Sequence, residues 1–205
     1  MGTSFNLNCQ TPSGAVIVRP TFYPRATMKA DGHVMFRSQV TRDLACLLDV
    51  DPDVATWATS SYGAEDDDTA PPFDFIVADH LGNRRLVDAP DRFRRRDPSK
   101  ALKDAEKLGF GYRGYSVDEV YSGYRLKNAR DLLRYGNYEV GLNDRVRLLL
   151  ALDENGSLTV AESLGAFQEI KPMAGLASMI LRGFVQVELD DELIGPQTAV
   201  RRIVG

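Results

Sequence analysis

The clearest helical pattern in the first half of the chain lies at residues 36–50. Four apolar residues recur there at the spacing of one helix face: Val40, Leu44, Leu47 and Leu48. The helix should end before Asp51, because the residue that precedes Pro52 avoids the α region. This segment therefore predicts an amphipathic helix that packs one face on a core.

Strand patterns lie on either side of this helix. Residues 14–23 alternate enough between apolar and polar side chains to predict a short strand. Residues 73–79 and 84–89 predict a hairpin, because glycine and asparagine between them tolerate the positive φ of a tight turn. Between the first helix and the hairpin, residues 63–72 predict an acidic loop that two prolines close.

The next segments are mostly helical in pattern. Residues 98–108 and 125–136 predict two helices, the first with Pro98 at its start and the second ending at Gly136. Residues 115–124, which lie between them, favour a short strand or a turn.

The last third of the chain predicts a different set of elements. Residues 143–183 predict three further helices, the first capped by Asn143 and stopped by Gly156, the third beginning near Pro172. Residues 184–204 then predict a strand, a turn and a last strand. Three helices and a two-stranded hairpin are the outline of a winged helix-turn-helix.

Composition allows one large folded domain or two small ones in 205 residues, with 43% hydrophobic and 26% charged residues. No apolar run approaches the roughly 18 residues that a membrane helix needs, and the N-terminus does not resemble a signal peptide. Cys9 and Cys46 are the only cysteines, and His33 and His80 the only histidines, which argues against a Cys/His metal cluster. We expect a cytoplasmic protein without a membrane partner.

Charge is distributed unevenly along the chain. The net charge of −4 does not indicate a nucleic-acid binder. Residues 49–79 nevertheless contain nine acids and no lysine or arginine, whereas residues 90–135 contain twelve lysines or arginines against seven acids. A small net charge can therefore hide a basic face beside an acidic one, although each run is also what a solvated surface would carry.

Two aspartates are the candidates for chemistry. A helix, then Asp74 on a strand, then a hairpin to a second strand that carries Asp88, is the element order of a restriction-endonuclease core. Such a core holds Mg²⁺ between carboxylates and uses the metal to activate water and neutralise the phosphate, usually with a lysine alongside. We take Asp74 and Asp88 as catalytic and metal-binding candidates. The alternative is a pair of strand-end acids that cap loops or pair with arginines.

At this point the sequence resembles the TnsA-like family, the endonuclease subunit of heteromeric transposases. The pattern of that family has a glutamate-bearing helix, an L-x-x-D-P-x-V segment, a P-D-F strand, a hairpin and a strand ending in E-V-K. Residues 37–57 and 71–90 follow this order, and the helical tail and final strands are similar to short relatives. The resemblance covers most of residues 30–205 and rests on the order of several weak motifs.

Transferred residue by residue, the resemblance fails where the chemistry would be. The helix glutamate corresponds to Thr41, and a nearby glutamate of the pattern corresponds to Arg37. The E-V-K triplet corresponds to Asp88-Ala89-Pro90, and Pro90 cannot replace a lysine amine. Arg85 or Arg92 could take the place of the lysine, but loss of cleavage is the stronger interpretation. No cofactor is then needed, or Mg²⁺ if the nuclease is active.

The resulting fold expectation is an α/β protein in two domains. Residues 1–136 would form a restriction-endonuclease-like PD-(D/E)XK core with a mixed sheet, and residues 137–205 a winged-helix-like domain. The candidates for DNA binding are basic residues of both domains: Arg92, Arg94, Arg95, Arg96, Lys171, Arg182, Arg201 and Arg202.

One glycine-rich segment is a further candidate for a binding role. Residues 109–115 lack the lysine–serine ending of a phosphate-binding loop, so they do not predict a nucleotide site. Tyr112 and Tyr115 could stack on bases, but a role in the core or in a loop is more common.

Three functions stay open from the sequence. The first is a nuclease-fold protein that binds DNA, or a DNA-bound partner, without cutting. The second is an active Mg²⁺-dependent endonuclease subunit that works with a transposase-type protein. The third is a protein-interaction module without DNA contact. A homodimer is compatible with each of them.

Overall fold

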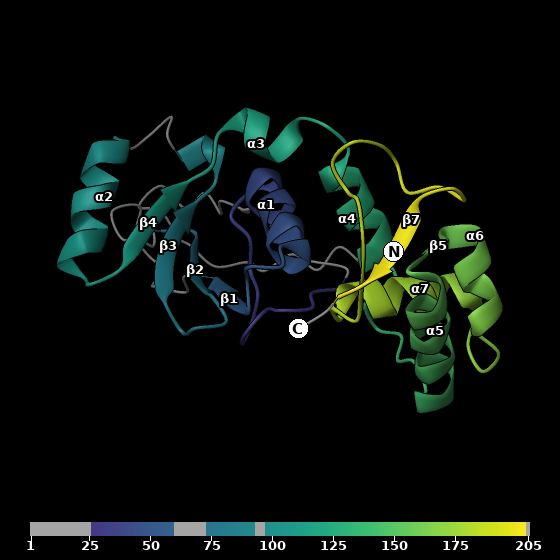
Figure 1. The fold of residues 1–205 in the computed structure, drawn as a ribbon. Helices are drawn as coiled ribbons and strands as arrows, with labels where there is room; N and C mark the ends of the chain where they lie inside the picture. Colours follow the sequence, from purple (N-terminus) through teal and green to yellow (C-terminus); the bar gives the residue numbers. More distant parts are fainter. Residues whose placement is uncertain (1–25, 60–72, 93–96, 204–205) are drawn as a thin grey trace, which may run out of the picture. The chain divides into compact units, whose positions relative to one another are not determined.

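The computed structural model describes residues 26–59, 73–92 and 97–203 (Figure 1). Internal contacts divide the chain into two compact units. The first contains Lys29–Leu48 and Asp53–Val120, and the second contains Asp49–Pro52, Tyr121–Gly205 and a short stretch ending at Met28. The sequence placed the division between residues 136 and 137, whereas the contacts place it before Tyr121.

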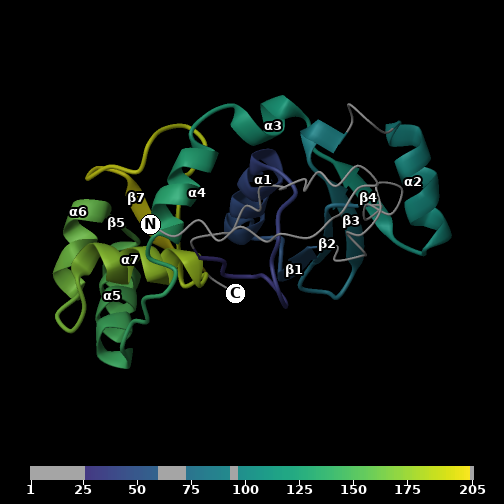
Figure 2. The same cartoon turned by 180° about the vertical axis from the view of Figure 1, so that it is seen from behind.

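The first unit is an α/β structure around a mixed four-stranded sheet in the order β1-β2-β3-β4 (Figures 1 and 2). β1 pairs antiparallel with β2, and β2 pairs antiparallel with β3, whereas β4 runs parallel to β3. Its elements, in chain order, are α1 (Gln39–Val50), β1 (Thr56–Thr59), β2 (Phe75–Ala78), β3 (Arg84–Asp88), the 3₁₀ helix η1 (Pro90–Arg92), α2 (Pro98–Lys107), β4 (Gly111–Gly114) and α3 (Val117–Tyr121).

Aromatic side chains pack on one face of this sheet. The rings of Trp57 and Phe75 meet edge to face with centroids 5.5 Å apart, and Phe36, three residues before the start of α1, contacts both rings. The opposite face carries a second cluster, in which α2 contributes its buried residues Ala101 and Ala105. Burial on both faces fixes the direction and register of the hairpin strands.

The hairpin expected at residues 73–89 is confirmed. β2 and β3 pair antiparallel from Phe75 opposite Val87 to Ala78 opposite Arg84. In the turn, Gly82 adopts a φ of 84°, and the carboxylate of Asp79 accepts hydrogen bonds from two backbone amides that follow it. The helices expected at residues 36–50 and 98–108 are also present as α1 and α2.

Two segments of the first unit differ from expectation. Residues 115–124 were expected to form a strand or turn, but they contain the short helix α3. Ser116 and Glu119 stabilise its start, because the side chain of each accepts a hydrogen bond from the backbone amide of the other. Residues 111–114 form strand β4, which the glycines of this segment did not predict. The expected strand at 14–23 and the acidic loop at 63–72 lie outside the described residues.

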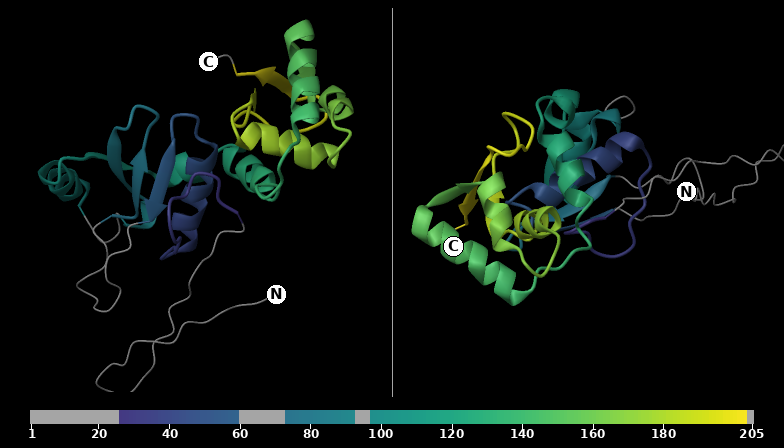
Figure 3. Two further views of the ribbon diagram at one scale, coloured as in Figure 1. Left: turned by 90° about the horizontal axis from the view of Figure 1, so that it is seen from below. Right: turned by 90° about the vertical axis from the view of Figure 1, so that its right-hand side faces the viewer.

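The second unit combines helices with a three-stranded antiparallel sheet in the order β5-β7-β6 (Figure 3). Its elements, in chain order, are α4 (Arg125–Leu133), α5 (Leu142–Asn155), β5 (Ser157–Thr159), α6 (Val160–Ser163), the 3₁₀ helix η2 (Leu164–Ala166), α7 (Pro172–Leu181), β6 (Val185–Val187) and β7 (Ala199–Arg202). Its core gathers apolar side chains from α5, α6, α7 and the sheet, among them Leu148, Leu152, Leu176, Met179 and Val200.

The three helices and the closing hairpin expected here are present, with two corrections. The N-cap of α5 is Gly141, not Asn143, because the Asn143 amide donates instead to the Glu169 carboxylate at 2.7 Å. Residues 157–159 form strand β5 before α6 begins, whereas the sequence favoured a helix throughout.

Helix α4 belongs to this unit through a buried asparagine. The Asn128 amide donates to the carbonyl oxygens of Leu189 and Glu192, and its side-chain oxygen accepts from the Ile194 amide. These contacts tie α4 to the segment between β6 and β7, which explains why the unit begins before α4. Within the described part of the chain, every helix is too short or too polar to cross a lipid bilayer.

The core of the first unit can be tested separately because Trp57 is the only tryptophan of the chain. Leu44 is fully buried in α1. We expect Leu44→Ala to lower the free energy of unfolding by about 2–5 kcal/mol, since the substitution removes buried methyl groups and leaves a cavity. Urea unfolding followed by Trp57 fluorescence measures it. Leu81→Ala, at an 88% exposed turn position, should leave the midpoint almost unchanged; equal losses in both variants would contradict this core assignment.

Candidate functional site

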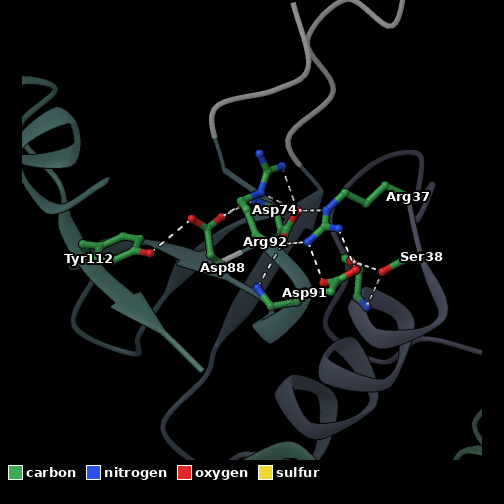
Figure 4. Close-up of polar contacts among 9 residues, drawn as sticks. Arg37, Ser38, Asp74, Asp88, Asp91, Arg92 and Tyr112 are labelled. Carbon is green, nitrogen blue, oxygen red and sulfur yellow. Dashed lines mark hydrogen bonds and ion pairs between the residues drawn. The ribbon is translucent and has the colours of Figure 1, made fainter. Parts of the chain in front are cut away.

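The hairpin brings Asp74 and Asp88 together at one end of the sheet (Figure 4). Asp74 directly precedes β2 and Asp88 is the last residue of β3. The backbone amide of Asp74 donates to the Val87 carbonyl at 3.1 Å and to the Asp88 carboxylate at 3.0 Å. Both aspartates are buried, at 5% and 0% relative exposure. The two candidates from the sequence therefore share one buried site.

Both carboxylate oxygens of Asp74 are occupied by hydrogen-bond donors. Arg37 approaches with two parallel bonds, Nε to Oδ1 at 2.6 Å and Nη2 to Oδ2 at 2.8 Å. Arg92 donates to Oδ1 from Nη2 at 2.9 Å and from Nε at 3.1 Å. The Ala89 amide adds a fifth contact, to Oδ2 at 2.9 Å. Five donors fill the roughly four lone-pair positions of a carboxylate.

Arg37 also joins Asp74 to a third acid, Asp91. Its Nη1 and Nη2 atoms donate to the two oxygens of Asp91, both at 2.7 Å. Arg37 lies just before α1, and the next residue, Ser38, caps that helix by accepting the Thr41 amide at 3.1 Å. The start of α1 thus sets the position of the arginine. Asp91 was not a candidate from the sequence, where its only signal is an acid directly before Arg92; in the structure it lies in η1.

Asp88 lies on the other side of Arg92. The Arg92 Nε atom is 3.3 Å from the Asp88 Oδ1 atom, and the Tyr112 hydroxyl of β4 donates to Oδ2 at 3.2 Å. Three acids, two arginines and a tyrosine from separate segments thus form one line of contacts (Figure 4). Of the two arginines considered as substitutes for the lysine, Arg92 enters the site, whereas Arg85 pairs with Val77 nearer the turn.

The pKa values of the two aspartates are shifted in opposite directions. Burial would raise the pKa of Asp74, but the hydrogen bonds and charges of Arg37 and Arg92 outweigh it and hold that pKa below its usual range. Burial and the neighbouring negative charge of Asp74 raise the pKa of Asp88 to about 6, against the opposing charge of Arg92. Asp88 is therefore the group of this site that changes its charge near neutral pH.

These residues do not fit a bound Mg²⁺ ion. A divalent cation needs free carboxylate oxygens, whereas those of Asp74 are filled by two guanidinium groups and an amide. Thr41, at the position of the helix glutamate, is buried with its hydroxyl 2.9 Å from that of Ser38. Among the described residues, no three His, Cys, Asp or Glu side chains are grouped to hold a metal. Two arginines lie where a cation would be needed.

The basic candidates outside this site are dispersed. Arg94, Arg95 and Arg96 lie outside the described residues. Lys171 and Arg182 flank the two ends of α7, while seven of its ten residues are buried. One of these is Ser178, which donates to the Tyr138 carbonyl at 2.8 Å.

The two candidates on the last strand, β7, are both exposed. Arg202 forms an ion pair with Asp153 of α5. The described DNA-binding candidates of the second unit therefore lie at the ends of α7 and on β7, not along the face of α7.

The sequence matches no protein-family model, and a search of curated proteins finds no match either.

The raised pKa of Asp88 predicts a pH dependence of stability. Between pH 3.8, the ordinary pKa of an aspartate, and about pH 6, Asp88 stays protonated in the folded protein but loses its proton in the unfolded chain. Proton binding by Asp88 therefore stabilises the folded protein, and this contribution is complete below about pH 3.8. That contribution is lost as the pH rises through 6. A shift of about two units corresponds to at most ~3 kcal/mol.

We expect Asp88→Asn to remove this part of the decline in unfolding free energy between pH 5 and pH 7.5, measured by urea unfolding at each pH. Asp79→Asn, in the exposed turn, is the matched control, because its low pKa places its titration below this window. Identical pH profiles of wild type and Asp88→Asn would contradict the assignment.

The Arg37 pairing predicts a large cost for its removal. Arg37→Ala leaves the buried Asp74 with one arginine, and breaking a buried pair costs about 3–5 kcal/mol. Because the Arg37 side chain is 35% exposed, we expect about 3 kcal/mol by urea unfolding. Lys107→Ala, which loses only an exposed pair with Asp104, should cost less than ~1 kcal/mol. If Arg37→Ala lowered the free energy of unfolding no more than Lys107→Ala does, the pairing of Arg37 with Asp74 would not stabilise the fold as expected.

Proposed function

We propose that this chain is a DNA-binding protein with a TnsA-like, PD-(D/E)XK nuclease fold that does not cleave, and acts in binding, regulation or assembly on DNA. The element order supports the fold assignment. Helix α1 precedes β2 with Asp74 at its start, and a hairpin leads to β3 with Asp88 at its end, within a mixed sheet. This is the order expected of a restriction-endonuclease core.

The observation that carries the loss of cleavage is the double pairing of Asp74 with Arg37 and Arg92. A guanidinium group neutralises a carboxylate, as a metal would, but it has no open position for water and stays protonated. It therefore cannot generate the metal-bound hydroxide that attacks a phosphodiester. Asp88, the remaining acid, is fully buried and contacts Tyr112 instead of solvent. The site can hold the strands together but lacks groups for hydrolysis.

The second unit is consistent with a winged-helix-like module. Its elements run α5, β5, α6, α7, β6 and β7, and its three strands form one antiparallel sheet. In such modules the helix equivalent to α7 reads DNA. The burial of α7 limits base contacts to its ends, so this unit contributes to phosphate contacts or to docking of a DNA-associated protein.

Two other functions remain as outcomes of the same test. The convergence of Asp74 and Asp88 at a sheet end favours an active Mg²⁺-dependent endonuclease, provided that Arg37 withdraws from Asp74 when DNA binds. The enclosed α7 favours a protein-interaction module without DNA contact.

We expect duplex DNA to bind with strong salt dependence and to stay intact. Fluorescence anisotropy with a labelled duplex at 50 and 150 mM salt, with and without Mn²⁺, measures binding, and a denaturing gel detects nicks. Replacing Arg94, Arg95 and Arg96 by alanine should reduce the slope of log Kd against log salt by roughly 0.9 for each lost phosphate contact.

Asp74→Asn is the control for cleavage, because it keeps the side-chain shape, and Trp57 fluorescence checks its folding. Metal-dependent nicks that disappear in Asp74→Asn would establish the endonuclease alternative. No binding at 50 mM salt would leave the protein-interaction alternative, because phosphate electrostatics are strongest there.

A further inference from the structure

Helix α2 carries three lysines along one face. Lys100, Lys103 and Lys107 are separated by three and four residues, which places them on the same side of a helix. All three are exposed. Their face lies roughly opposite the two buried residues of α2, Ala101 and Ala105, because successive residues turn by about 100°. We call these three residues the lysine stripe.

The stripe points away from the sheet. Through its alanines, α2 packs on a cluster that includes Phe73 and Leu86, and it lies alongside β4 at the outer edge of the sheet in both Figure 1 and Figure 2. Alanine side chains are short, so α2 lies close to the sheet and the lysines form its outer surface.

The positive charge of the stripe is only partly neutralised. Lys107 lies 3.5 Å from the Asp104 carboxylate, and its side chain is 77% exposed. Among the described residues, no carboxylate lies within ion-pair distance of Lys100 or Lys103. The other acids of this region are Glu106, which is exposed on α2, and Asp97, whose side chain caps the helix through the Ser99 amide.

Lysines three and four residues apart on a helix repel each other. Lys103 is flanked on both sides by such a pair, with Lys100 and with Lys107. An anion bound along the stripe would relieve this repulsion, and a regular row of cations fits a regular row of anions.

We propose that the lysine stripe of α2 is the surface on which this protein contacts the phosphates of a nucleic-acid duplex. The assignment rests on the proposed DNA-binding function and names its contact surface. From Lys100 to Lys107 the helix rises about 10 Å. A duplex carries one charge per roughly 1.7 Å of its axis, so several phosphates lie within reach of three flexible lysines. These are contacts for position and affinity, not for sequence.

The stripe also differs from α7, the equivalent of the helix that reads DNA in winged-helix modules. Seven of the ten residues of α7 are buried, whereas α2 buries only two alanines and leaves its three lysines in solvent. A helix must expose a face to approach a duplex, and α2 does so.

The test compares two variants that each remove three positive charges. The stripe variant is Lys100→Gln/Lys103→Gln/Lys107→Gln, since glutamine keeps helix propensity close to that of lysine. The matched control removes three exposed cations that have the same spacing on and directly after α4, Lys127→Gln/Arg130→Gln/Arg134→Gln. Both are titrated with the labelled duplex over a salt series, and far-UV circular dichroism confirms that each is folded.

We expect the stripe variant to reduce the slope of log Kd against log salt by about 2–3, at roughly 0.9 per contact, and the control to change it by less than about 1. If wild type binds and the stripe variant keeps its slope, the stripe assignment is overturned while DNA binding stands. If wild type fails to bind at 50 mM salt, the proposed function itself fails. Polyglutamate that competes as well as DNA at equal charge would show a face for acidic proteins and overturn the nucleic-acid assignment.

Discussion

A buried carboxylate with two arginine partners organises the first unit. Asp74 is almost inaccessible to solvent, and a carboxylate in such a place must be paired or neutralised. Arg37 binds it from the start of α1, and Arg92 binds it from η1. Arg92 also reaches Asp88 at the end of β3, which Tyr112 of β4 contacts in turn. One set of charges thus joins the first helix, the hairpin and the parallel strand.

The same pairing decides what chemistry is open to the site. In a metal-dependent nuclease, converging carboxylates bind a divalent ion that also binds water. Here the guanidinium groups neutralise the acids directly, and their hydrogen bonds use the oxygens that a metal would need. The residual negative charge resides on Asp88, whose raised pKa reflects burial beside another acid. The cluster joins the start of α1, the hairpin and β4 through paired charges and hydrogen bonds.

Helices α7 and α2 differ in how far their charges are exposed to solvent. In the second unit, α7 is enclosed by its own core, and its flanking cations lie at the helix ends. In the first unit, α2 has so little apolar surface that only two alanines anchor it, which leaves a face of lysines in solvent. The charges of a helix can contact a polyanion only where the helix is exposed. This depends on the burial of the helix more than on its position in the chain.

Local patterns in the sequence were enough to predict α1, the β2–β3 hairpin, α2 and α7, because helical periodicity, proline positions and turn residues act over a few neighbours. The convergence of Asp74 and Asp88 also followed, since a hairpin must bring its two outer ends together. Strand β4 could not be predicted, because its glycine-rich residues gain strand structure only by pairing with β3. The pairing of Arg37 with Asp74 and Asp91, across 37 and 54 residues, was likewise decided by the tertiary structure alone. Its cause is the desolvation of Asp74, which exists only once the chain has folded around it.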